Sequence, residues 1–140
     1  VEKEVSLILD DLSEFVYPDF FDFVKNFDKK DLILLSFGTI DFQGMKIKNS
    51  DIVSYFQEII ITNKDKTENL KNILKKNKDK KIFFIDDKAE QIDIIKEKLP
   101  QIIAMKMERS QGRHINTESK LADYVVKDLN EAKNICKTGA

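Results

Sequence analysis

The stretch Ile82-Phe83-Phe84-Ile85, followed directly by Asp86 and Asp87, constrains the fold of this chain more than any other. Four consecutive apolar residues are typical of a strand covered on both faces, so the two carboxylates are predicted to emerge at its carboxyl end. Ligands bind at that edge of an open α/β sheet. Adjacent carboxylates repel each other unless something compensates, and Mg²⁺ prefers oxygen ligands. Asp86 and Asp87 are therefore candidate metal ligands; the alternative is a solvated turn that caps the next helix.

Apolar runs and amphipathic segments alternate along most of the chain. This alternation predicts an α/β fold of three layers, with a doubly wound and mainly parallel, Rossmann-like sheet. The 140 residues suit one domain. The predicted strands are 32–35, 58–62, 82–85, 102–107 and 122–126, and the predicted helices are 19–27, 42–50, 51–56, a segment through 70–74, 89–99 and 129–135.

The N-terminal segment allows two interpretations. Apolar residues recur at three- and four-residue steps between positions 5 and 15, which favours a helix over 2–15. The alternative is a strand over 5–9 that ends in Asp10 and Asp11. We prefer the helix.

Composition excludes several functional classes. The net charge of -1 and the balance of lysines with acids predict no nucleic-acid partner. No apolar run approaches membrane-spanning length, so no membrane contact is expected. The single cysteine, Cys136, cannot form an internal disulfide, and this favours a cytoplasmic setting.

Two further polar clusters follow predicted strands. Ser36-Phe37-Gly38 can offer a hydroxyl and backbone N–H groups to an anion, although an ordinary turn is the alternative. Lys64 and Lys66 follow the strand 58–62 and could reach a phosphate, although solvated lysines are the alternative. Because the carboxyl ends of parallel strands converge on one crevice, these clusters and the acidic pair are informative together.

Both arginines of the chain, Arg109 and Arg113, lie in the polar segment 108–119. Elsewhere the chain uses lysine, so the planar, bidentate guanidinium is a candidate ligand for an anionic part of a substrate. The alternative is a solvated loop in which the two arginines have no shared role.

The ordered set of motifs resembles the haloacid dehalogenase-like (HAD) hydrolase superfamily. Ser36 matches its second motif, Lys66 or else Lys64 its third, and Asp86-Asp87 its fourth. The resemblance implies a Mg²⁺-dependent phosphatase of a small phosphorylated substrate, in which Ser36 and the lysine bind phosphate oxygens. It covers about residues 15–135, and the flanking segments 16–19, 54–56, 60–62 and 122–129 agree with it.

One departure from the family is serious. The first motif, an Asp-x-Asp that supplies nucleophile and general acid on a strand between those of the second and fourth motifs, is missing, because Leu12 stands where the second Asp would be. We expect an upstream segment to supply the motif and interpret residues 1–14 as a remnant of a cap or linker helix. A degenerate first strand over 5–9 would also account for the departure, as would a non-catalytic relative of the family.

The sequence thus predicts a HAD-like phosphohydrolase core, incomplete without its nucleophile motif. The alternative is a non-catalytic HAD-like binding or regulatory module. A phospho-accepting receiver domain is disfavoured, because the acidic pair follows the serine and the lysine instead of opening the chain.

Overall fold

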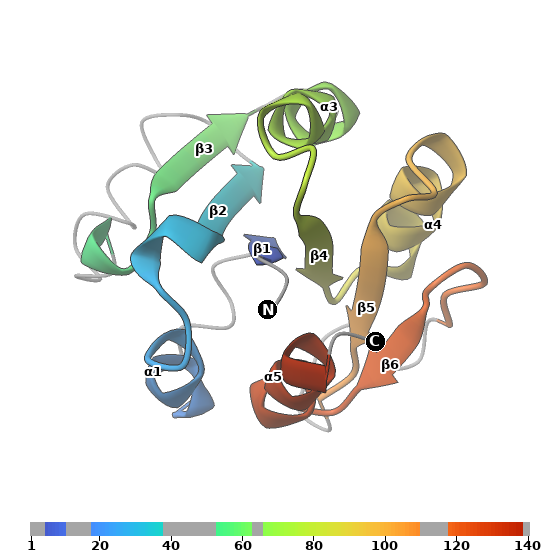
Figure 1. The fold of residues 1–140 in the computed structure, drawn as a ribbon. Helices are drawn as coiled ribbons and strands as arrows, with labels where there is room; N and C mark the ends of the chain where they lie inside the picture. Colours follow the sequence, from blue (N-terminus) through green and yellow to red (C-terminus); the bar gives the residue numbers. More distant parts are fainter. Residues whose placement is uncertain (1–4, 11–17, 38–52, 63–65, 110–117, 139–140) are drawn as a thin grey trace.

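The computed structural model describes residues 5–10, 18–37, 53–62, 66–109 and 118–138. They form one six-stranded sheet of order β3-β2-β1-β4-β5-β6, in which all five strand pairings are parallel (Figure 1). This confirms the predicted doubly wound α/β architecture. The strands are β1 (Val5–Asp10), β2 (Leu32–Phe37), β3 (Glu58–Thr62), β4 (Lys81–Asp86), β5 (Ile103–Met107) and β6 (Tyr124–Val126).

Helices cover both faces of the sheet. Helices α1 and α5 lie side by side on one face, and α3 and α4 cover the other (Figure 1). In the part of the chain that the structure describes, no helix is both long and apolar enough to cross a bilayer. The α-helices are α1 (Asp19–Val24), α3 (Lys66–Lys76), α4 (Ala89–Lys98) and α5 (Leu129–Thr138), with short 3₁₀ turns η2 (Lys29–Asp31) and η3 (Val53–Tyr55).

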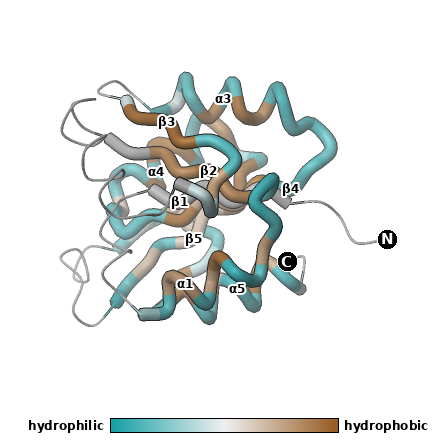
Figure 2. The backbone as a smooth tube through the Cα atoms, turned by 90° about the vertical axis from the view of Figure 1, so that its left-hand side faces the viewer, coloured by the Kyte–Doolittle hydropathy of each residue, from teal (hydrophilic) through white to brown (hydrophobic). Residues whose placement is uncertain are grey.

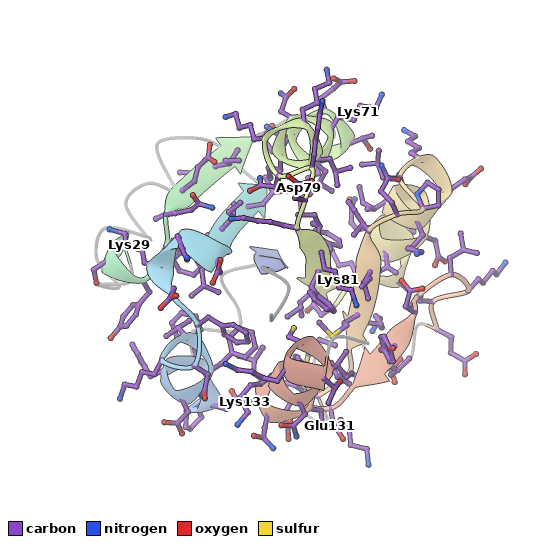
Figure 3. All side chains as sticks on the ribbon, in the orientation of Figure 1. Lys29, Lys71, Asp79, Lys81, Glu131 and Lys133 are labelled. Carbon is purple, nitrogen blue, oxygen red and sulfur yellow. The ribbon has the colours of Figure 1, made fainter. Side chains whose placement is uncertain are left out.

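Two apolar layers sandwich the sheet, as the hydrophobic strands between largely hydrophilic outer helices show (Figure 2). Consecutive residues of β4 belong to opposite layers. Phe83 packs toward α1 and α5, whereas Phe84 packs toward α3 and α4. Polar side chains such as Lys71 and Glu131 lie on the outer helix surfaces (Figure 3). Because β4 is covered on both faces, its continuous apolar run is the pattern expected of a buried parallel strand.

The preference for an N-terminal helix was wrong. Residues 5–10 form β1, which pairs with β2 on one side and β4 on the other, so the expected gap between those strands is filled. A central strand needs no polar face, so Val5-Ser6-Leu7-Ile8-Leu9 is a near-continuous apolar run whose helix-like spacing is coincidental. Residues 5–10 are therefore part of the sheet instead of a cap or linker helix.

The other predicted elements are present with shifted ends. Helix α1 ends at Val24, three residues earlier than predicted, and the described part of the predicted helix 51–56 contains a 3₁₀ turn, η3. Strand β6 is limited to Tyr124–Val126, and α5 extends to Thr138. The predicted helix 42–50 lies outside the described residues.

A seam between α1 and α5 joins distant parts of the chain. The carboxylate of Asp19 accepts a hydrogen bond from the backbone N–H of Leu129 through Oδ2, at 3.0 Å. At the other end of the seam, Lys137 Nζ donates to the carbonyl of Asn26 at 2.8 Å and lies 5.0 Å from the centre of the Phe27 ring. The seam closes one face of the domain over the sheet.

Candidate active site

The end of the central strand brings two acidic residues together. Leu9 of β1 is paired with Ile85 of β4, so Asp10 and Asp86 are the next residues on adjacent strands. On its other side Asp10 is paired with Leu35 of β2. Neighbouring strands are about 4.8 Å apart, so Asp10 and Asp86 are backbone neighbours at the carboxyl edge. An acidic residue therefore ends the strand that lies between the strands of Ser36 and Asp86.

The same row continues on the next strand, because Asp86 is paired with Lys106 of β5. We call Leu35, Asp10, Asp86 and Lys106 the carboxyl-end row. The row crosses four adjacent strands and contains three ionisable residues. The sequence placed Asp10 at a strand end only in the alternative interpretation of residues 5–9, and Lys106 was not predicted as a site residue, although a lysine within an otherwise apolar strand was a visible signal.

The buried polar side chains that the structure describes gather at this end of the sheet. Among the described residues, every buried polar or charged side chain lies at a strand's carboxyl end or just beyond it. Three of the charged ones are cations (Lys66, Lys106, Arg109) and one is an acid (Asp86). Because burying charge is costly, their concentration marks a functional edge. The full set is Thr62, Lys66, Thr67, Asp86, Lys106 and Arg109.

Asp86, the last residue of β4, and Asp87, which follows it, have different environments. Asp86 is 1% exposed, and its Oδ1 accepts a hydrogen bond from the backbone N–H of Lys88 at 3.1 Å, which fixes its carboxylate in a turn. Asp87 is partly buried. Its Oδ1 is buried and accepts no hydrogen bond from any residue that the structure describes. An unsatisfied buried carboxylate oxygen is costly, so Asp87 is suited to a cation.

The predicted phosphate ligands are only partly described. Ser36 and Phe37 are the last residues of β2, paired with Ile61 and Thr62 of β3, and lie one and two residues beyond Leu35 of the row. Lys66 is buried at the start of α3, the helix that follows β3. Gly38 and Lys64 lie outside the described residues. The roles of all five residues in binding stay predictions.

Arg109 takes part in an internal ion pair. Its guanidinium lies 2.9 Å from Oδ1 of Asp19, whose other oxygen is bonded to the N–H of Leu129. Arg109 thereby connects the segment after β5 to the start of both α1 and α5. Arg113 lies outside the described residues, and substrate binding by either arginine stays a prediction.

Asp93 of α4 anchors the far end of the segment that contains Arg113. Its carboxylate accepts hydrogen bonds from Ser119 Oγ at 2.6 Å and from the N–H groups of Lys120 and Leu121 at 3.1 and 2.9 Å. Burial raises the pKa of Asp93, but these hydrogen bonds and the Lys120 charge outweigh it and hold the pKa below its ordinary value of 3.8. The ionised carboxylate thus fixes residues 119–121 against α4.

Cys136 is unsuited to nucleophilic chemistry. It is buried in α5, and burial raises the pKa of its thiol to about 12. The thiolate is the reactive form, so this cysteine belongs to the core.

Comparison with solved structures identifies the class of fold. A protein described as a haloacid dehalogenase-like hydrolase from Burkholderia xenovorans matches 87% of this chain with a TM-score of 0.70 at 16% identity, and the match covers 58% of that protein. The NMR structure of the core domain of a protein described as a phosphoglycolate phosphatase from Streptococcus pneumoniae matches with a TM-score of 0.66 at 16% identity, covering 98% of each chain.

A third structure, described as a HAD hydrolase from Bacillus subtilis, is bound to magnesium. It matches 86% of this chain and 54% of its own length, with a TM-score of 0.64 at 16% identity. The similar structures also include L-2-haloacid dehalogenases. No protein-family model and no curated protein sequence matches the chain.

The chain therefore has the Rossmann-like fold of HAD-like hydrolases. It spans 58% of the Burkholderia protein and nearly all of the Streptococcus core domain, so it corresponds to the core of such proteins.

Proposed function

We propose that this chain is the core of a Mg²⁺-dependent phosphohydrolase that acts on a small phosphorylated substrate, with Asp10 as its nucleophile. The carboxyl-end row carries the proposal, because Asp10 ends the central strand directly beside Asp86. The HAD-like fold supports the same function. The sequence led us to expect the nucleophile on an upstream segment. We now propose Asp10 in that role.

The proposed reaction has two displacements at phosphorus. A carboxylate oxygen of Asp10 attacks phosphorus, the bond to the leaving-group oxygen breaks with its electron pair on that oxygen, and an aspartyl-phosphate forms. Water then attacks this phosphorus and gives up a proton to solvent, and the bond between phosphorus and the Asp10 oxygen breaks, which releases phosphate and restores the Asp10 carboxylate. Ser36 and Lys66 would bind the phosphate oxygens, and Arg109 or Arg113 would hold a more distant anionic part of the substrate.

The donor set fits a hard divalent cation. Asp86 and Asp87 are consecutive, and Asp87 offers the buried oxygen Oδ1, which accepts no hydrogen bond within the described part of the chain. Mg²⁺ is commonly held by one or two carboxylates together with water and substrate oxygens. The described side chains contain no cluster of three candidate ligands, and Asp10, the nearest acid along the row, would be a further ligand. Bound Mg²⁺ would offset the charge between these carboxylates and the phosphate.

Replacing Asp87 with Asn should weaken Mg²⁺ binding about tenfold or more, since the buried oxygen would lose its negative charge. Isothermal titration calorimetry of the variant and the wild type measures the change. Asp79→Asn is the matched control, because Asp79 is exposed in the turn at the opposite end of β4. Equal Mg²⁺ affinities of Asp87→Asn and Asp79→Asn would remove the metal assignment.

Because Leu12 replaces the second Asp of the motif, the hydrolysis rate should depend on the leaving group of the substrate. With Leu12 at that position the leaving group receives no proton from a carboxylic acid there, and such general acids contribute about 10² to 10⁴ in rate. We expect Mg²⁺-dependent hydrolysis of p-nitrophenyl phosphate, whose leaving group departs without a proton. Glycerol phosphate should be hydrolysed at least about 10²-fold more slowly.

Phosphate release from both substrates, with and without EDTA, measures this difference. The variant Leu12→Asp is the companion test, since it restores an acid two residues after Asp10 and should narrow the difference. Equal wild-type rates on the two substrates would contradict the inferred lack of an acid. The second candidate function is a non-catalytic binding module, which the leucine at position 12 favours. Binding of Mg²⁺ and phosphate without turnover of either substrate would support it.

A further inference from the structure

Lys106 is the most deeply buried charged residue that the structure describes. Its side chain is 0% exposed in β5, a strand that otherwise consists of Ile103, Ala104, Met105 and Met107. Its Nζ donates to the carbonyl of Met107 at 3.2 Å and lies 3.8 Å from Oε1 of Glu108. A lysine in such a position carries a large desolvation cost that apolar packing would avoid. The mechanism proposed above gives it no role.

Strand register places Lys106 directly beside the acidic end of β4. Asp86 and Lys106 are paired across the two strands, so they lie on the same face of the sheet. That face is the one covered by α3 and α4, because Phe84 and Ala104, two residues earlier on each strand, belong to its apolar layer. The Nζ contact with the Met107 carbonyl directs the ammonium toward the carboxyl edge.

A buried positive charge at this place acts in opposite ways on the two ligands of the proposed site. It attracts an anion such as phosphate, and it repels a divalent cation. In the low-dielectric interior such effects are much stronger than in water. The negative charge of Glu108 partly cancels the positive charge of Lys106. The Glu108 side chain is 25% exposed, so solvent screens its charge and weakens this cancellation.

We propose that Lys106 is a positioning residue that sets the balance between phosphate and Mg²⁺ binding at the carboxyl-end row. Its ammonium, beside Asp86 in the strand register, strengthens phosphate binding at the expense of metal affinity. The inference rests on the proposed function for the location of both ligands. It concerns binding alone and does not require turnover.

The test is Lys106→Met, which keeps the length of the side chain and removes its charge. We expect Mg²⁺ to bind about three- to tenfold more tightly and inorganic phosphate to bind about tenfold more weakly than in the wild type. Calorimetry measures Mg²⁺ alone, and phosphorus NMR measures phosphate at saturating Mg²⁺. The two affinities should change in opposite directions. A loosened structure would instead weaken the binding of both ligands.

Glu108→Gln is the second variant, and it changes a partly exposed side chain. It removes the opposing charge and should shift both affinities the other way, with weaker Mg²⁺ and tighter phosphate binding. Lys78→Met is the charge-matched control, because Lys78 is exposed in the turn before β4, next to Asp79, which is labelled in Figure 3. It should change neither affinity.

The outcomes separate this inference from the proposed function. If folded Lys106→Met binds both Mg²⁺ and phosphate more weakly, or if neither affinity changes, the proposed role of Lys106 is overturned. Opposite shifts of the two affinities in a protein without phosphatase activity would support Lys106 and overturn the proposed reaction. A wild type that binds neither ion would overturn both.

Discussion

Replacing Asp10 with Asn should lower the turnover of p-nitrophenyl phosphate by at least about 10³-fold, because loss of a nucleophile removes the covalent route altogether. The fold should survive. The pairing of β1 with β4 uses backbone groups, and asparagine keeps the size of the aspartate side chain while it removes the charge. Steady-state kinetics at saturating Mg²⁺, together with a urea denaturation curve, measures both expectations.

Asp11→Asn is the matched control for the nucleophile. It makes the same chemical change one residue later, beyond the end of β1 at Asp10, and should retain most of the activity. Loss of activity confined to Asp11→Asn would move the nucleophile off the row. Full activity in both variants would show that neither Asp10 nor Asp11 is the nucleophile, which would contradict the mechanism.

The largest loss of stability should come from Phe20→Ala, at about 3 to 5 kcal/mol of unfolding free energy. Phe20 is fully buried in α1, and its ring lies 6.4 Å from that of Phe56 and 6.5 Å from that of Tyr55. Alanine would leave a cavity between α1 and the segment around η3, because the surrounding rings can collapse only partly. Urea denaturation followed by circular dichroism measures the loss.

Phe21→Ala provides an internal comparison within the same helix. Phe21 is 41% exposed, and it contacts Phe20 and Tyr55 at ring-centre distances of 5.2 and 5.9 Å. Both substitutions make the same change in helix propensity, so the difference between them reports burial. We expect Phe21→Ala to cost less than half as much as Phe20→Ala. Equal losses would mean that Phe20 is not part of the core.

The fold was predictable from sequence because the local patterns agreed with the global architecture, except at β1. There, residues between 5 and 15 satisfy the helical spacing and the buried-strand pattern at the same time. Only the need of β2 and β4 for a partner decides between them, since unpaired backbone groups inside a sheet are costly. That need is visible in the strand order and not in the local sequence.

The site was predicted in part for the same reason. Asp86, Asp87 and Lys66 follow clear strands or begin a helix, so their position at the carboxyl edge could be read from the chain. The ion pair of Arg109 with Asp19 joins residues far apart in sequence, and the pairing of Lys106 with Asp86 depends on the register between β4 and β5. Neither relation has a local signature.

The seam between α1 and α5 has a consequence for how the protein is made on the ribosome. Helix α1 emerges early, yet the backbone N–H that binds its Asp19 belongs to Leu129, and the lysine that reaches Asn26 is Lys137. Phe20 of α1 can pack against Phe56 earlier, but the side of α1 that faces α5 lacks the cover that α5 provides until nearly all of the described chain has left the exit tunnel. Until then this surface is open to chaperones and to self-association, and attachment of α5 covers it.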